Sequence, residues 1–212
     1  MVLQMGTDDL FKKRRQAELL KRMEGQRGKK RDNVLIVTEG ERTEPLYFEG
    51  FRLANVTVEG CGYNCDSLIR HAKHLENQYK RNQGKVFDKI WCVFDRDSFP
   101  LANFDSAFAL AAAYGYEVAY SNEAFELWYL LHFNYYDSQL SRQQYCDKLT
   151  ALLGFRYSKN DRRIYSMLLD RQPQAIKWAE RLLTTHNGIL PRNANPSTTV
   201  VRLVAYLNQW TK

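Results

Sequence analysis

Strand-like and helix-like segments alternate along residues 33–121, and this order restricts the fold more than any other feature of the chain. Short apolar segments rich in β-favouring residues lie at 33–40, 55–60, 90–95 and 116–121. Segments with helical spacing or helix-favouring composition separate them, at 43–54, 65–81 and 101–115. The alternation predicts an α/β fold with a small, mainly parallel sheet flanked by helices.

The second half of the chain shows helical patterns and no strand pattern. Helices are expected at 123–133, 143–154, near 161–169, at 173–186 and at 196–210. We therefore predict three regions: a basic, partly flexible N-terminal arm at 1–32, an α/β core at 33–121, and a helical subdomain packed on the core at 122–212.

Positive charge is concentrated at the N-terminus. Residues 1–31 hold ten Lys and Arg against four Asp and Glu, whereas the other 181 residues carry a net charge of only +1. A basic arm of this kind can bind nucleic-acid phosphates independently of sequence, or it can be a solvated, partly helical tail. The candidate nucleic-acid-binding residues of the arm are Lys12, Lys13, Arg14, Arg15, Lys29, Lys30 and Arg31.

Neither a membrane span nor a signal peptide is expected, because no apolar run approaches about 20 residues and the basic N-terminus leads into a polar segment. The predicted location is the cytoplasm, where cysteines are thiols. Cys61, Cys65, His71 and His74 raise the question of zinc, but their spacing is much tighter than that of a usual finger. A turn followed by two histidines on a helix surface is the favoured reading.

Acidic residues follow two of the predicted strands. The strand at 33–40 ends at Glu39, and the strand in IWCVFDRDSF ends at Asp95, with Asp97 two residues later. If these strands are neighbours in a parallel sheet, the three carboxylates face one crevice beyond the strand ends. Hard oxygen ligands suit Mg²⁺ or Mn²⁺, which can activate water and stabilise charge on a phosphoryl oxygen. The alternative is that Asp95 and Asp97 form a polar turn that caps the following helix.

Four segments of the chain resemble the RloB family: VTEGERTEPLYFEGF, WCVFDRDSF, SNEAFELWYLLHF and NPSTTVVRLV. The resemblance spans roughly residues 33–208. That family is similar to Toprim-type proteins and is associated with prokaryotic restriction and phage-defence loci. The resemblance implies a Toprim-like fold in which Glu39, Asp95 and Asp97 bind Mg²⁺, with Glu39 alternatively acting as general acid or base. It also implies a separately encoded partner ATPase.

Glu126 lies in FELWYLLHF, a segment so apolar that most of its faces must be buried. A buried carboxylate is costly unless it is paired, hydrogen-bonded or bound to metal. Glu126 is therefore predicted either as a further ligand or general base, or as a paired structural carboxylate. Glu44, in the segment after the first strand, is another candidate site residue.

Two further segments supply candidates. Lys159, Arg162 and Arg163 lie in a basic loop that either binds a scissile phosphate or is simply solvated. A Tyr-x-Lys element at this loop also resembles the family. The run Asn195-Pro196 reads as a helix start, with Asn as cap and Pro at the first helical position. The following Ser197 and Thr198 are candidates to approach the site, because this run also resembles the family.

The favoured function is a Mg²⁺-dependent nuclease that hydrolyses DNA or RNA in prokaryotic antiphage defence together with a partner ATPase, since the chain has no Gly-rich phosphate loop of its own. The main alternative is a non-catalytic nucleic-acid-binding or regulatory subunit on a Toprim-like scaffold. A Toprim topoisomerase or primase is disfavoured by the length of 212 residues. The nature of the nucleic acid, the trigger and self-association as a homo-oligomer are left open.

Overall fold

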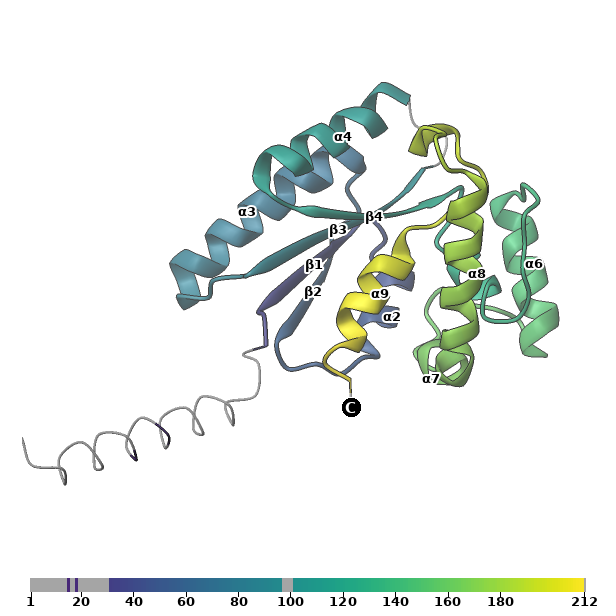
Figure 1. Cartoon of the computed structure of the whole chain (residues 1–212), viewed down its shortest axis with the longest axis horizontal. Coiled ribbons are helices and arrows are strands. Elements are labelled where there is room, and N and C mark those ends of the chain that lie inside the picture. The colour runs from purple at the N-terminus through teal and green to yellow at the C-terminus, as the bar shows by residue number, and fades with distance from the viewer. Residues whose placement is uncertain (1–14, 16–17, 19–30, 97–100, 212) are drawn as a thin grey trace, which may run out of the picture. The chain divides into compact units, whose positions relative to one another are not determined.

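The computed structural model describes residues 15, 18, 31–96 and 101–211 of the chain. The chain divides into two compact units, residues 1–31 and residues 32–212. The fold reported below is that of the second unit (Figure 1), in which strands and helices alternate in the first half and helices follow one another in the second.

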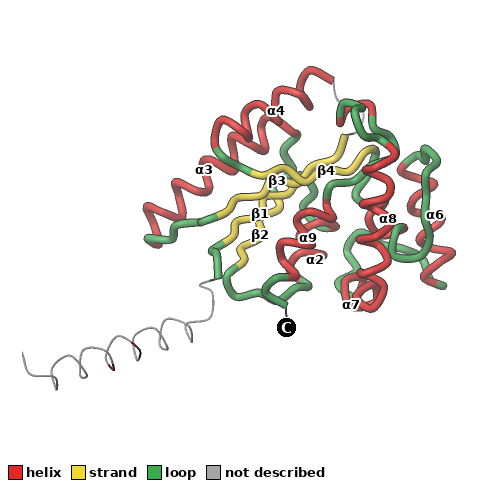
Figure 2. Tube along the Cα trace, in the orientation of Figure 1, coloured by secondary structure: helices red, strands yellow, loops and turns green. Residues whose placement is uncertain are grey.

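Four parallel strands form one sheet with the order β2-β1-β3-β4. Their bounds are Val34–Thr38 for β1, Val56–Gly60 for β2, Lys89–Arg96 for β3 and Glu117–Asn122 for β4. Figure 2 shows them side by side in the middle of the unit. The predicted α/β fold with a mainly parallel sheet is confirmed, and β1 and β3, the strands that end in acidic residues, are direct neighbours.

Both faces of the sheet are buried, as expected of a parallel sheet covered by helices. Successive side chains of β1 point to opposite faces, so Leu35 and Val37 join one core whereas Val34 and Ile36 join the other. Helices α3 (Cys65–Gln83) and α4 (Leu101–Tyr114) cover the first face. Helices α2 (Thr43–Glu49) and α9 (Val200–Asn208) lie on the other side of the sheet (Figure 1).

The remaining helices pack around the core on the side of α2 and α9. They are α5 (Glu126–Leu130), α6 (Arg142–Leu153), α7 (Ile164–Leu168) and α8 (Gln172–Thr185), with short 3₁₀ turns at Leu169–Arg171 and Pro191–Asn193. The apolar segment 123–133 was predicted as one helix, but only Glu126–Leu130 is helical. Glu123, which follows β4 directly, has a φ of 70°, and this left-handed conformation separates the strand from the helix. In the described ranges, no helix is long and apolar enough to cross a membrane.

The segment after residue 193 differs from the prediction. Asn195 and Pro196, which are joined by a cis peptide bond, do not begin a helix, and α9 starts only at Val200. Thr198 instead forms an isolated antiparallel bridge with Ser121 of β4. The Asn122 N–H donates to Ser197 O at 2.7 Å, and the Thr199 N–H donates to Tyr120 O at 2.8 Å. The residues before α9 therefore line the outer edge of β4.

Candidate functional site

The carboxyl ends of β1 and β3 bring Glu39 and Asp95 together. The Glu39 N–H donates to Val93 O at 2.8 Å, which continues the pairing of the two strands past the end of β1. In return, Glu39 Oε2 accepts a hydrogen bond from the Asp95 N–H at 3.0 Å. The structure thus joins two of the three acids predicted to share a cation, whereas Asp97 lies outside the described residues.

Two further carboxylates lie near Asp95. Glu44 is in the first turn of α2 and Glu126 is the first residue of α5, and both are almost fully buried. Burial raises the pKa of Asp95 well above its usual value, and the negative charges of Glu44, Glu126 and Glu39 raise it further, while Arg142 opposes this shift. Burial also raises the pKa of Glu44, with Glu126 adding to the effect. The charges of three other acids therefore act on Asp95 at this edge of the sheet.

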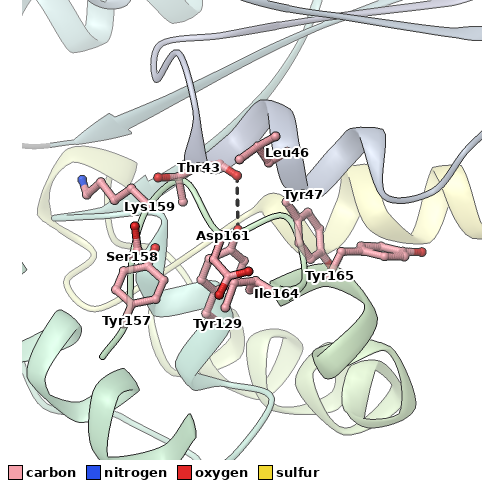
Figure 3. A pocket seen from close by; sticks show the side chains of 10 residues that line it. All are labelled: Thr43, Leu46, Tyr47, Tyr129, Tyr157, Ser158, Lys159, Asp161, Ile164 and Tyr165. Atoms are coloured by element: carbon pink, nitrogen blue, oxygen red, sulfur yellow. Dashed lines mark hydrogen bonds between the residues drawn. The ribbon is translucent and has the colours of Figure 1, made fainter. Parts of the chain in front are cut away.

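Glu126 is held by residues of the loop that precedes α7. The Tyr157 hydroxyl donates to Glu126 Oε1 at 3.0 Å, and Lys159 Nζ lies 3.6 Å from the same oxygen. Figure 3 shows Tyr157 beside Tyr129, whose hydroxyl donates to Thr43 O at 3.2 Å (dashed line), and Lys159 extending away from the two rings. The buried glutamate predicted from the sequence is thus paired, and the loop containing Lys159 reaches the acidic cluster.

Arg142 is a site residue that the sequence analysis did not identify. It is the first residue of α6, and its Nη2 lies 3.6 Å from Asp95 Oδ2. The run Ser141-x-x-Gln144 forms a capping box that fixes this helix start. Its sequence pattern indicates that a helix begins here. The pattern does not indicate, however, that the helix start faces β3, because that proximity depends on how α6 packs on the unit.

Glu39, Glu44 and Asp95 line an open pocket of about 500 Å³, whereas Glu126 is not part of its lining and contacts Lys159, which is. The acids at its floor are Glu39 from the loop after β1, Glu44 from the first turn of α2 and Asp95 from β3. Arg142 and Lys159 approach from the helical half of the chain. The complete lining is Glu39, Gly40, Glu41, Arg42, Thr43, Glu44, Gly62, Asp95, Arg142 and Lys159.

The chemistry of this donor set fits a hard divalent cation. Carboxylate oxygens are the ligands of Mg²⁺, and a cation would offset the negative charges that, after burial, raise the pKa of Asp95. Among the residues that the structure describes, no three Asp, Glu, His or Cys side chains already surround a single point. Glu39 accepts from a backbone N–H, and Asp95 and Glu126 face cationic side chains, so a cation would replace these contacts rather than enter a preformed cage.

The other basic candidates are spread over the surface. Arg162 Nη1 lies 4.0 Å from Glu49 Oε2, and Arg163 forms an ion pair of 2.6 Å with Asp161. Neither lines the pocket, in contrast to Lys159 of the same loop. Of the arm candidates, Arg15 and Arg31 are exposed, and the rest lie outside the described residues: Lys12, Lys13, Arg14, Lys29 and Lys30.

Ser197 and Thr198 are fully buried at the edge of β4 and do not line the pocket. The Ser197 hydroxyl donates to Ala194 O, and the Thr198 and Ser121 hydroxyls are 2.9 Å apart. These contacts explain both residues structurally, as supports of the strand that leads to Glu126.

The comparison with family models agrees with the resemblance drawn from the sequence. A search of curated proteins and a search of solved structures returned no match. The family model described as RloB-like protein matches residues 34–207, which include all four strands, α2 to α8, α9 except its last residue, and every residue of the pocket. The chain therefore belongs to the RloB-like family.

Proposed function

We propose that this protein is a metal-dependent nuclease that hydrolyses phosphodiester bonds in DNA or RNA. The observation that carries the proposal is an open pocket lined by Glu39, Glu44, Asp95, Arg142 and Lys159, with the buried Glu126 beside Lys159. Metal-assisted phosphodiester hydrolysis requires acids that hold a divalent cation, and groups nearby that attract the phosphate.

In this proposal Glu39, Asp95 and Asp97 hold Mg²⁺ or Mn²⁺, and Glu44 and Glu126 are further candidates from the same cluster. The bound cation supplies an activated water and stabilises charge on a phosphoryl oxygen. Lys159 attracts the phosphate to the pocket, and Glu126 orients Lys159 through the contact of 3.6 Å. The role in prokaryotic antiphage defence and the partner ATPase are proposed from the family alone, and the basic arm is proposed to bind nucleic-acid backbone.

One observation favours the second candidate function, a non-catalytic binding or regulatory subunit. Asp95 and Glu126 each have a cationic partner within 4.0 Å, and Glu39 accepts from a backbone N–H. Such a network can stabilise the strand ends without any metal, because charges buried with partners and hydrogen bonds need no further ligand. The test must therefore separate loss of chemistry from loss of structure.

The test uses Asp95→Asn and Asp97→Asn in the full-length chain. Cleavage of total cellular RNA and of plasmid DNA is measured with Mg²⁺, with Mn²⁺ and with EDTA, and folding is followed by thermal unfolding. We expect each variant to lose at least about 100-fold in rate, since even outer-shell partners of metal ligands contribute about 10- to 100-fold. Asp88→Asn is the matched control, because Asp88 precedes the opposite end of β3 and its Oδ2 accepts the Asn33 N–H.

Two outcomes would contradict the nuclease. Cleavage that persists in EDTA would show that the reaction needs no divalent cation. Cleavage by both folded variants at the wild-type rate would show that Asp95 and Asp97 take no part in it. Metal-independent binding of nucleic acid without any cleavage would favour the binding subunit instead.

A further inference from the structure

Arg142 is held near Asp95 by hydrogen bonds as well as by the ion pair between the two side chains. The capping box of α6 fixes its backbone: Ser141 Oγ accepts from the Gln144 N–H, and Gln144 Oε1 accepts from the Ser141 N–H at 2.8 Å. The Arg142 Nε donates to the backbone O of Glu123 at 3.1 Å. The backbone of Arg142 is fixed by the capping box and its Nε by Glu123 O, and its Nη2 faces Asp95.

The carbonyl that receives Arg142 comes from a strained residue. Glu123 has a φ of 70°, a left-handed conformation that is unfavourable for a residue with a Cβ. Its N–H donates to Arg96 O at 2.8 Å, so the residue still belongs to the β3–β4 pairing at this end of the sheet. Strain of this kind persists where the surrounding structure enforces it, and it is concentrated at functional sites. Here it turns one carbonyl toward the arginine at the pocket.

Arg142 is far more exposed than its acidic partner. Its side chain is 45% exposed, whereas that of Asp95 is 14% exposed, and the arginine lines the same open pocket as Lys159. A partner that served only to neutralise Asp95 would gain most by being buried with it. A half-exposed guanidinium at the rim can contact an incoming anion, and its planar fork matches the oxygens of a phosphate.

We propose that Arg142 is a substrate-binding residue that contacts a backbone phosphate of the bound nucleic acid at this pocket. The inference rests on the proposed function, because it names the group that the site receives and the residue that receives it. Glu123 is then a positioning residue, which acts through its backbone carbonyl. Lys159 adds positive charge to the same pocket from the loop before α7.

The experiment measures binding rather than cleavage. A fluorescein-labelled single-stranded oligonucleotide, as DNA and as RNA, is titrated with the full-length protein in EDTA at several KCl concentrations. A phosphate contact contributes about 0.7 to the slope of log affinity against log salt for a single strand. We expect Arg142→Ala to reduce that slope by about 0.7 and to weaken binding about 10-fold, as for loss of a charged hydrogen bond. Arg70→Ala removes the same charge from an exposed position on α3 and is the matched control.

Arg142→Lys provides a second test that can be used even if the protein with alanine at this position does not fold. It keeps the charge, so the salt slope should stay within experimental error of wild type while affinity falls, because the bidentate fork is lost. A salt slope and affinity of Arg142→Ala equal to those of Arg70→Ala, with the fold intact by thermal unfolding, would overturn the inference. If Arg142→Ala does not fold, Arg142→Lys decides: affinity equal to wild type overturns the inference.

Failure of this inference and failure of the proposed function can be told apart. If wild-type protein cleaves neither nucleic acid but Arg142→Ala loses affinity and slope, hydrolysis is wrong and the phosphate contact stands. If wild-type protein cleaves in Mg²⁺ and Arg142→Ala binds like Arg70→Ala, hydrolysis stands and the assignment of Arg142 is wrong.

Discussion

Tyr157 contributes to the site by satisfying a carboxylate that is removed from water. Its hydroxyl donates to Glu126 Oε1 at 3.0 Å, and both side chains are buried. We expect Tyr157→Phe to lower the free energy of unfolding by about 1–3 kcal/mol, because the oxygen loses its donor and cannot regain water. Urea unfolding measures the change. Tyr63→Phe is the control, since Tyr63 is 46% exposed and its change should stay within about 0.5 kcal/mol. Equal effects of the two substitutions would contradict the prediction.

His132 makes stability depend on pH. Its Nδ1 lies 2.9 Å from Trp128 O, and its Nε2 is buried without a hydrogen-bond partner. A neutral ring that donates from Nδ1 suits this site, whereas a protonated ring would bury an unpaired N–H. Burial lowers the pKa of His132 from 6.5 to about 4, and the charge of Arg171 acts in the same direction.

Because the folded-state pKa lies below the unfolded-state value, the unfolded chain binds the proton more readily between pH 4 and 6.5. The contribution of neutral His132 is therefore complete above pH 6.5 and is lost as the pH falls toward 4. We expect His132 to account for about 2 kcal/mol of destabilisation between pH 7 and pH 5. Urea unfolding of wild type and His132→Gln at both values measures this, and an equal pH dependence of the two proteins would contradict it.

Residues of the site differ in how readable they are from the sequence. Glu39 and Asp95 could be identified because each directly follows a buried apolar strand, and strand ends of a parallel sheet share one edge. Glu126 could be identified because a carboxylate stands out in an apolar segment. Arg142 could not, since it lies in a polar stretch and reaches Asp95 only through the packing of α6.

At the scale of elements, the capping box at the start of α6 stabilises the fold and also fixes the position of Arg142 at the pocket. Ser141 and Gln144 satisfy each other's backbone N–H groups at the helix start. We expect Ser141→Ala to lower the free energy of unfolding by about 1 kcal/mol, as for loss of an N-cap. It should also weaken oligonucleotide binding, because Arg142 is the next residue. Thermal and urea unfolding measure the first effect, and anisotropy measures the second.

The control for the cap is Ser67→Ala, an exposed serine within α3 that replaces the hydroxyl by a better helix former. It should leave stability unchanged or slightly higher. A Ser141→Ala variant that is as stable as Ser67→Ala would mean that the capping box does not hold the helix start.

Whether a sequence segment revealed its element depended on what its apolar residues were packed against. Strands β1 and β3 were readable because four or five consecutive apolar residues, bounded by polar residues, suit a sheet with two buried faces. The segment 123–133 is buried on nearly all sides, so its composition reports burial but not where the helix begins and ends. The run before α9 misled because Asn195 and Pro196, typical of a helix start, here precede residues that pair with β4.

At the scale of the whole molecule, the arm is expected to govern non-specific affinity. The concentration of charge in residues 1–31 predicts that deletion of residues 11–31 weakens nucleic-acid binding and lowers its salt dependence, because fewer phosphate counterions are released. Anisotropy titrations at several salt concentrations measure both quantities. A variant with the arm residues in scrambled order should bind like wild type, since phosphate contacts do not read sequence. An unchanged slope after deletion would exclude the arm from binding.

The origin of the pocket residues along the chain has a consequence for synthesis. The acids at the floor, Glu39, Glu44 and Asp95, all precede residue 100, whereas Arg142 and Lys159 come from α6 and the loop after it. The ribosome therefore produces every floor carboxylate before either of these two cations. A chain that ends before residue 142 therefore contains the floor acids Glu39, Glu44 and Asp95 but lacks Arg142 and Lys159 of the pocket.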